Sequence, residues 1–291
     1  MDAPPASWPR LEAAALQSLC RGPSRWAPPS ALHGLPLMGF PAGLPDLPSV
    51  ALAAKARVCQ WEAAAEGGLR VEAFVLQLEA ARVHFEERNL RPRQIAAATG
   101  AADVAAQKRV WQRTCVRLIA PSAAEGLRNF LHWRFTQRCS GLCGMTVQEM
   151  ADRALATYPA VSRAVPPRVF AACLRSLWNG WITARRFQGH AACVFGCAGG
   201  EDSIEHYSEC RWVAAAAATH FGLARPATRH SRLARFVLLE PAWSAAAAGE
   251  LQRRARLTCS VYLTHCWTRH AGACPPEACR SALRQKAREL S

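Results

Sequence analysis

From residue 49 onward, apolar side chains recur every three or four positions along most of the chain. This spacing places them on one face of a helix, so it predicts amphipathic helices over 49–66, 69–90 and 103–119. In the second of these stretches the apolar face consists of Val71, Phe74, Leu78, Ala81 and Phe85. The third has as core candidates Val104, Val110, Trp111, Val116 and Leu118.

Helix-start and helix-stop signals continue through the second half of the chain. Thr146 and Glu149 have the spacing of a capping box, in which each side chain bonds the other residue's backbone amide. A further helix is predicted to begin at the Pro166-Pro167 pair and to end at Asn179-Gly180. Helices are also predicted over 203–221, 229–239, 244–270 and 277–290.

Alternation typical of β-strands is nearly absent, which predicts a mainly α, bundle-like fold with one small insertion that resembles a metal knuckle. Closely spaced prolines in the first 48 residues prevent long helices and predict an extended arm that packs through Trp26 and Phe40. The predicted domains are a Pro-rich arm (1–48), a helical region (49–172), a zinc-knuckle segment (173–222) and C-terminal basic helices (223–291).

Charge and cysteine content bear on the partners of the protein. The formal net charge is +15, and lysine contributes only Lys55, Lys108 and Lys286, so arginine supplies most of the positive charge. This excess of arginine favours a polyanionic partner, either nucleic acid or an anionic membrane surface. Coding bias is an alternative cause of the arginine-rich composition. With no secretion signal or membrane-spanning run recognised, an intracellular protein of nucleus or cytoplasm is expected, and few of its 13 cysteines should form disulfides.

The stretch CVFGCAGGEDSIEHYSEC has the pattern C-x3-C-x8-H-x3-C and predicts a metal site. Structural zinc takes four thiolate or imidazole ligands, and Cys193 and Cys197 bracket a short turn at Gly196. On a helix, His206 and Cys210 would share a face at i and i+4. The predicted ligands are Cys193, Cys197, His206 and Cys210, and because protein fills all four positions the metal would be structural rather than catalytic.

Several details of this site and its alternatives stay open. Asp202 or Ser203 can cap the helix that carries His206, and four acids are candidates to orient its imidazole: Glu201, Asp202, Glu205 and Glu209. Buried thiols with a core histidine are the alternative to a metal. His190 is a substitute ligand, and plain packing is favoured for the pairs Cys139–Cys143 and Cys274–Cys279.

Aromatic and arginine residues flank the quartet. Trp178, Trp181 and Phe187 lie close to Arg185 and Arg186, a combination that suits stacked bases and phosphates. For the two tryptophans, burial in the core is the favoured alternative. Arg211 and Trp212 directly follow Cys210 and would extend the same surface.

The segment NGWITARRFQ, followed by the Cys-Cys-His-Cys quartet and EDSIEHYSEC, resembles the zinc-binding segment after the reverse transcriptase domain of non-LTR (LINE-type) retrotransposon polyproteins. The resemblance covers roughly residues 173–213, and residues 49–172 would correspond loosely to the thumb and linker. It implies zinc on the four ligands named above and template contacts by Arg185 and Arg186. Both short gaps in the quartet are three residues here, where the family more often has two and four.

Polymerase chemistry is not expected. A polymerase palm usually has adjacent aspartates that hold two magnesium ions, and no two aspartates are adjacent in this chain. The sequence therefore predicts a non-catalytic, zinc-dependent region that binds RNA or a DNA–RNA hybrid. A protein-interaction scaffold and an inactive retroelement fragment are the alternatives.

Two arginine series remain downstream. Arg225, Arg229, Arg232 and Arg235 are spaced by four, three and three residues, and Arg280, Arg284 and Arg288 by four. Each series predicts either a phosphate-facing stripe on a helix or an ordinary solvated face.

Overall fold

The structure is a computed structural model that describes residues 29–40, 50, 123–138, 144–240, 247–272 and 274–291. These residues are mostly helical, and among them the only β-type pairing is an isolated antiparallel bridge between Ala192 and Glu201. The predicted mainly α class is therefore confirmed. Most of the predicted arm and the helices predicted over 49–66, 69–90 and 103–119 lie outside the described residues.

The described helices of eight residues or more are α8 (Ala123–Arg138), α9 (Val147–Ala164), α10 (Pro167–Leu177), α12 (Arg211–Phe221), α13 (Arg229–Phe236), α14 (Ala248–Ala271) and α15 (Pro276–Leu290). Shorter helical segments are α2 (Pro29–His33), η1 (Leu35–Met38), η2 (Arg185–Phe187) and α11 (Ile204–Glu209). No helix in the described part of the chain has the length and apolar character needed to cross a bilayer. Residues 36–40 and the described residues from Arg128 onward belong to one compact unit, which contains the Cys/His quartet.

Local sequence signals explain where α9 and α10 begin and end. The Thr146 hydroxyl accepts from the Glu149 amide, and the Glu149 carboxylate accepts from the Thr146 amide, so the predicted capping box is present. α10 starts with Pro167 at its first turn, where the missing N–H costs nothing. It ends before Asn179, which adopts a left-handed conformation with φ of 51°. α10 runs across the predicted domain boundary between residues 172 and 173, and the predicted division into domains stays a prediction.

The prediction of one helix over 203–221 is wrong, because the chain bends at Cys210. The backbone there has φ −56° and ψ 125°, which closes α11 and opens α12. The two helices then pack against different neighbours, α11 against α13 and α12 against α15. His206 and Cys210 are therefore not on one continuous helix, although they still converge.

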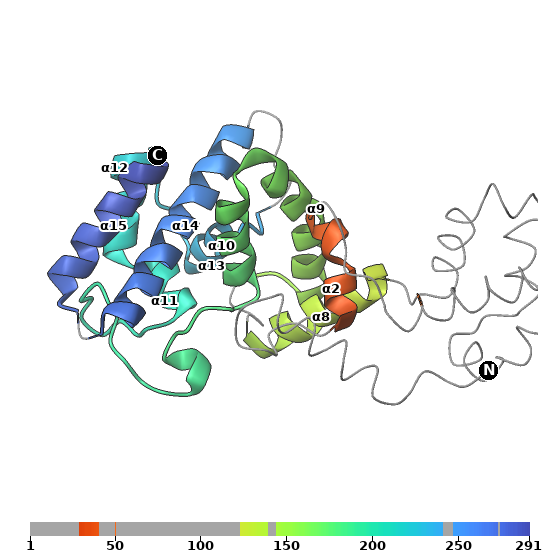
Figure 1. Cartoon of the computed structure of the whole chain (residues 1–291), viewed down its shortest axis with the longest axis horizontal. Coiled ribbons are helices and arrows are strands. Elements are labelled where there is room, and N and C mark those ends of the chain that lie inside the picture. Colours follow the sequence, from red (N-terminus) through yellow and green to blue (C-terminus); the bar gives the residue numbers. More distant parts are fainter. Residues whose placement is uncertain (1–28, 41–49, 51–122, 139–143, 241–246, 273) are drawn as a thin grey trace, which may run out of the picture. The chain divides into compact units, whose positions relative to one another are not determined.

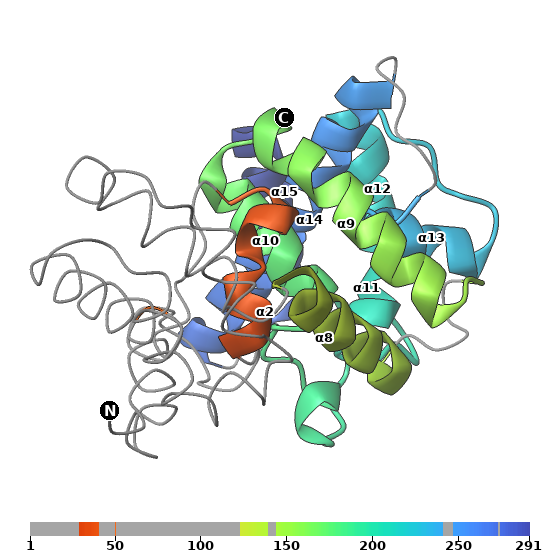
Figure 2. The same cartoon turned by 90° about the vertical axis from the view of Figure 1, so that its right-hand side faces the viewer.

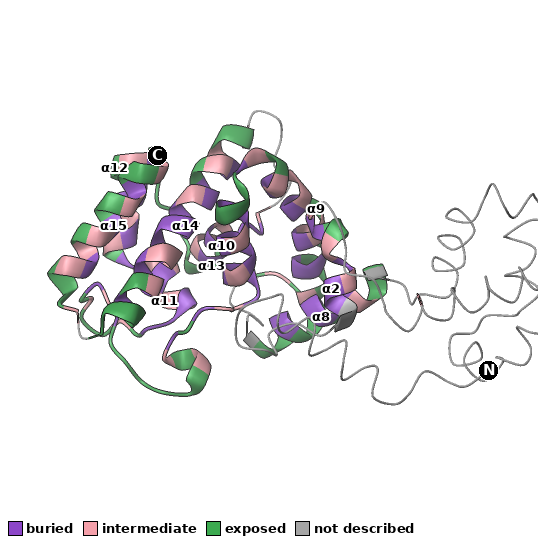
Figure 3. Ribbon diagram, in the orientation of Figure 1, coloured by how far each residue is buried: buried purple, intermediate pink, exposed green. Residues whose placement is uncertain are grey.

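α14 is the central helix of this unit and packs against α9, α10, α12, α13 and α15. Figure 1 shows it (blue) between α10 and α15, and Figure 3 shows buried residues along its length. Its buried face includes polar residues such as Ser260 and Thr264, whose hydroxyls donate to the carbonyls of Arg256 and Ser260. These internal bonds satisfy the hydroxyls without water, so the helix can be buried despite its polar sequence.

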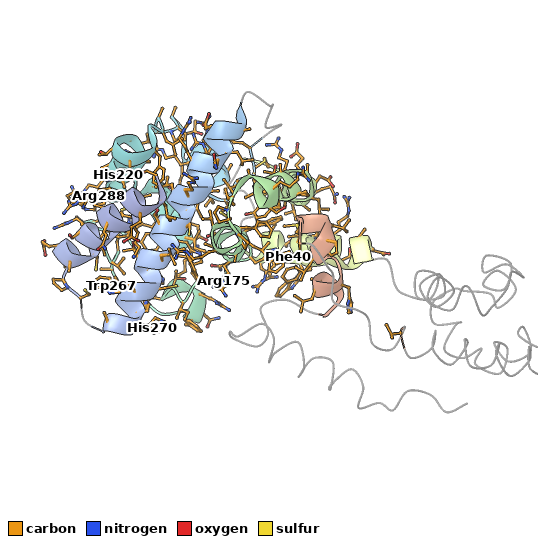
Figure 4. The ribbon with its side chains drawn as sticks, turned by 45° about the horizontal axis from the view of Figure 1, so that its top comes forward. Phe40, Arg175, His220, Trp267, His270 and Arg288 are labelled. Carbon is orange, nitrogen blue, oxygen red and sulfur yellow. The ribbon has the colours of Figure 1, made fainter. Side chains whose placement is uncertain are left out.

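Aromatic side chains fasten α10 and the following turn to α14. Trp178 and Trp181 are both fully buried, which confirms the core alternative for the two tryptophans. The indole of Trp181 donates to the Ser176 hydroxyl at 2.9 Å, and its ring lies 5.4 Å from that of His265 on α14. Arg175, labelled in Figure 4, donates to the Tyr262 hydroxyl of α14 at 2.7 Å. Phe40, also labelled, packs edge-on against Phe170 of α10 at 5.0 Å.

Candidate metal centre

The four predicted ligand residues converge on one point. The ligand atoms of Cys193, Cys197, His206 and Cys210 all lie within 4.8 Å of one another, and the Sγ atoms of Cys197 and Cys210 are 3.4 Å apart. Zinc–sulfur bonds of about 2.3 Å in a tetrahedron place neighbouring sulfurs roughly 3.8 Å apart. The group is therefore compact enough to hold one metal ion. Three of the ligand side chains come from loops and only His206 lies within a helix.

Backbone hydrogen bonds shape the turn that carries the first two thiols. The Cys193 amide donates to the Gly200 carbonyl at 2.7 Å, and the Gly200 amide donates to the Cys197 carbonyl at 3.2 Å. Between the cysteines, Gly196 adopts φ of +75°, which glycine reaches without strain. The turn thus reverses the chain between Ala192 and Glu201, the two residues of the isolated bridge, and brings Cys197 back toward α11.

The turn is also packed against the C-terminal helix. A side chain added at Gly196 would approach Cβ of Pro276 to 2.8 Å, and Arg280 of α15 donates to the Phe195 carbonyl at 3.3 Å. The first turn of α15 therefore covers the outer side of the cysteine turn.

His206 has the environment of a ligand rather than that of an ordinary core histidine. The predicted Ser203 cap is present, and its hydroxyl accepts from the His206 amide at 3.1 Å. The Nε2 atom of His206 is buried and has no hydrogen-bond partner, although buried polar atoms are normally paired. Its ring edge lies where a Cβ at Gly200 would stand, with Cε1 at 2.4 Å and Nε2 at 2.5 Å.

This close approach gives a direct test of the ring position. Gly200→Ala is expected to push the imidazole out of the group and weaken metal binding by at least tenfold, since loss of even an outer-shell partner of a ligand typically costs about 10–100-fold in affinity. Gly199→Ala is the matched control, because a side chain at Gly199 meets nothing within 4 Å and only its φ of +68° adds strain. Competition of each variant against a chromophoric chelator measures the difference, and equal affinities would contradict the ring position.

The thiols of Cys193 and Cys210 shift each other's pKa in opposite directions. The hydrogen bond from Cys210 outweighs burial and lowers the pKa of the Cys193 thiol well below its ordinary value. The same hydrogen bond, with burial, raises the pKa of Cys210. Two thiols thus lie close enough for each to influence the charge of the other, as expected where sulfurs are arranged around one cation.

Asp202 does not orient His206, contrary to one sequence-based expectation. Its buried carboxylate accepts from Tyr207 at 2.5 Å and lies 3.0 Å from Nε2 of His265, and it forms an ion pair with Arg269. The Ala184 amide also donates to it, at 2.8 Å. Burial raises the pKa of Asp202, but the hydrogen bonds from His265, Tyr207 and the Ala184 amide prevail and lower it to about 2.

Two of the other three acids, Glu205 and Glu209, also have side-chain partners elsewhere. Glu205 lies 3.8 Å from Arg185, Glu209 forms an ion pair with Arg229, and the backbone of Glu201 forms the bridge to Ala192. His265 and Arg269 were not anticipated from the sequence, since they lie more than 60 residues from Asp202 and form no motif with it.

Arg185 and Arg186 occupy the η2 turn, which projects from the helices below α11 in Figures 1 and 2. Phe187 at its end is 61% exposed, and the Arg186 guanidinium lies 5.6 Å from the centre of that ring. Two surface cavities of about 400 and 280 Å³ adjoin the turn, and both are lined by Arg185 and Gln188. The turn therefore presents an arginine and an aromatic face to solvent.

The second predicted pair has a different environment. Arg211 is exposed at the start of α12, and Trp212 is half-buried with its ring covered by two guanidinium groups. The Arg211 group is 5.0 Å from the ring and the Arg280 group 4.4 Å. The Trp212 ring therefore already makes cation–π contacts with an arginine of α12 and an arginine of α15.

Known proteins offer no assignment for this chain. No protein-family model, curated protein or solved structure matches it.

The remaining candidates lie apart from the quartet. His190 is exposed and lines the larger cavity beside Arg185, and it is not among the residues that converge on the metal position. Cys279 is buried on α15, where burial first and then Cys274 raise the pKa of its thiol to about 11, which agrees with packing. Cys139 and Cys143 lie outside the described residues.

Proposed function

We propose that the protein is a non-catalytic zinc-binding module that presents arginines to RNA or to a DNA–RNA hybrid. The observation that carries the proposal is the convergence of three thiols and one imidazole, whose buried Nε2 has no hydrogen-bond partner. The bound ion would join the cysteine turn to α11 and α12.

The donor set favours zinc over other common ions. Calcium and magnesium prefer oxygen ligands, whereas thiolates with one imidazole form a typical structural zinc site. Four protein ligands complete a tetrahedron, which leaves no position for an activated water. The site is therefore proposed to stabilise the fold rather than to catalyse a reaction.

The η2 turn is the proposed contact with nucleic acid. Its two arginines can bond phosphates, and the exposed ring of Phe187 can stack on a base. The Arg185 side chain is about half-exposed and lies 3.8 Å from Glu205, a long ion pair, so its guanidinium can also reach a phosphate. The hydrogen bond from the Ala184 amide to the Asp202 carboxylate links this turn to the segment between the proposed metal ligands.

The retrotransposon resemblance supports RNA or a hybrid duplex as the preferred partner. In that family the corresponding segment follows a polymerase domain, and an origin from such a polyprotein is part of the proposal. The net charge of +15 agrees with a polyanionic partner.

Salt dependence tests the proposed binding. If about four arginines contact phosphates, log affinity for single-stranded RNA or a hybrid should fall with log salt with a slope of roughly −3 to −4. The double variant Arg185→Gln/Arg186→Gln is expected to reduce that slope by about 1.5, because two phosphate contacts are lost. Fluorescence anisotropy with labelled oligonucleotides measures both quantities.

The control removes two other exposed arginines, in Arg163→Gln/Arg253→Gln. It carries the same net charge as the η2 double variant, so its slope should change far less. A flat salt response of the unaltered protein, or equal changes in the two double variants, would contradict binding through the η2 turn.

A protein-interaction scaffold is the second candidate. Exposed apolar side chains favour it, since Trp133 is 53% exposed, Ile182 48% and Phe187 61%. A flat salt response together with a metal-dependent fold would support this candidate instead.

A further inference from the structure

The first downstream arginine series does not form one stripe. Arg225 precedes Pro226 and lies outside α13, and Arg229 turns toward the carboxylate of Glu209. One cavity is lined by the three members of the series other than Arg229, which are Arg225, Arg232 and Arg235. A fourth arginine enters the same cavity from α14, Arg254, which is only 6% exposed.

This cavity, the arginine pocket, has a volume of about 50 Å³. A cavity needs roughly 10–15 Å³ on this measure to hold one water, so the pocket has room for about three or four waters or one tetrahedral oxyanion. Its apolar lining comes from Val213, Ala217, Leu223, Phe236 and Leu257. An apolar lining lowers the local dielectric constant and strengthens the attraction between guanidinium groups and an anion.

Two of the four guanidinium groups donate to backbone carbonyls, which are neutral. Arg232 donates to the carbonyls of Pro226 at 2.9 Å and Ala227 at 2.7 Å, and Arg225 donates to the carbonyl of Glu209 at 3.0 Å. These bonds hold the side chains in place without neutralising their charge.

The other two guanidinium groups are held by carboxylates. Arg235 pairs with Glu240, and Glu250 lies between Arg235 and Arg254. Four cations against two carboxylates leave two positive charges around the pocket. Each guanidinium has five N–H donors, so donors remain for a ligand.

We propose that the arginine pocket binds a phosphate group. A phosphate supplies about two negative charges and up to four acceptor oxygens, which match the excess charge and the converging donors. The group can come from inorganic phosphate or from the phosphorylated end of a nucleic acid. This binding goes beyond the function proposed above, because it requires neither the metal nor the η2 turn.

Titration calorimetry of the full chain with inorganic phosphate, at constant ionic strength in chloride, tests the proposal. One saturable site is expected. Arg232→Gln should weaken it by at least roughly tenfold, the cost of one charge-assisted hydrogen bond. Arg229→Gln, which removes the same charge from the same helix but does not line the pocket, should change the affinity by less than about threefold.

The variants are chosen so that they fold. Arg232 has carbonyl partners, so its loss leaves no buried carboxylate unpaired, and the exposed Arg225 provides a second variant, Arg225→Gln, with the same expected weakening. Absence of a saturable site, or equal losses in the Arg229 and Arg232 variants, would overturn the proposal.

Competition identifies the source of the phosphate. An RNA trinucleotide with a 5′-phosphate that displaces inorganic phosphate, when its 5′-hydroxyl counterpart does not, assigns the pocket to nucleic-acid ends. Displacement by neither trinucleotide, with the inorganic site intact, assigns it to a free phosphate compound. Because inorganic phosphate is measured alone, failure of this site is separate from failure of RNA binding.

Discussion

Purified protein is expected to carry close to one equivalent of zinc, and the Cys210→Ala variant close to none. Removing one thiolate opens the tetrahedron and leaves the remaining thiols without their shared cation. Structural zinc contributes about 10–16 kcal/mol of apparent free energy in small finger peptides. A typical domain has only about 5–15 kcal/mol of net stability, so even part of that contribution is decisive here.

Elemental analysis and thermal unfolding measure this effect together. Cys259→Ala is the matched control, since Cys259 is equally buried on α14 but lies outside the ligand group. It should keep the zinc and lose only the small packing contribution of one sulfur. Zinc retained in the Cys210 variant, or absent from the unaltered protein, would remove the basis of the proposed metal site.

Asp202→Asn is expected to lower the free energy of unfolding by about 3–5 kcal/mol. The substitution keeps the shape of the side chain but removes the buried carboxylate that accepts from Tyr207 and the Ala184 amide and pairs with Arg269, and each hydrogen bond to a charged group is worth about 1.5–3 kcal/mol. The turn that begins at Ala184 should also loosen, because its amide is bonded to the same carboxylate.

Urea denaturation and limited trypsin digestion report these two consequences separately. Digestion should cut sooner at Arg185 and Arg186 in the variant, since a loosened turn reaches the protease more easily. Asp152→Asn serves as control, because Asp152 and its partner Arg128 are both nearly half-exposed. Its cost should stay below about 1 kcal/mol. Equal costs for the two substitutions would show that the Asp202 network adds no stability.

Features set by neighbours in the sequence were predictable. The capping box at Thr146, the proline entry of α10 and its exit before Asn179 depend on residues within one turn of each other. The convergence of the four candidate ligands was predictable for the same reason, since two short spacings and a glycine turn bring them together.

Features set by tertiary packing were not predictable. The break at Cys210 arises because α11 and α12 pack against different helices, and the alanine-rich sequence that follows carries no stop signal. Asp202 was one of four candidates to orient His206, whereas its histidine partner, His265, lies on α14, 63 residues away. The arginine series was read as one face, although a proline interrupts it and Arg254 joins it from another helix.

The contact between Gly196 and Pro276 ties the cysteine turn to a helix that begins about 80 residues later in the chain. Small zinc fingers are self-sufficient, since metal and a few neighbouring residues complete their fold. Here one wall of the candidate metal site is supplied by the last helix, so residues 190–212 are not a self-contained finger. The C-terminal helix and the cysteine turn therefore support each other, so deletion of either would remove packing contacts from the other.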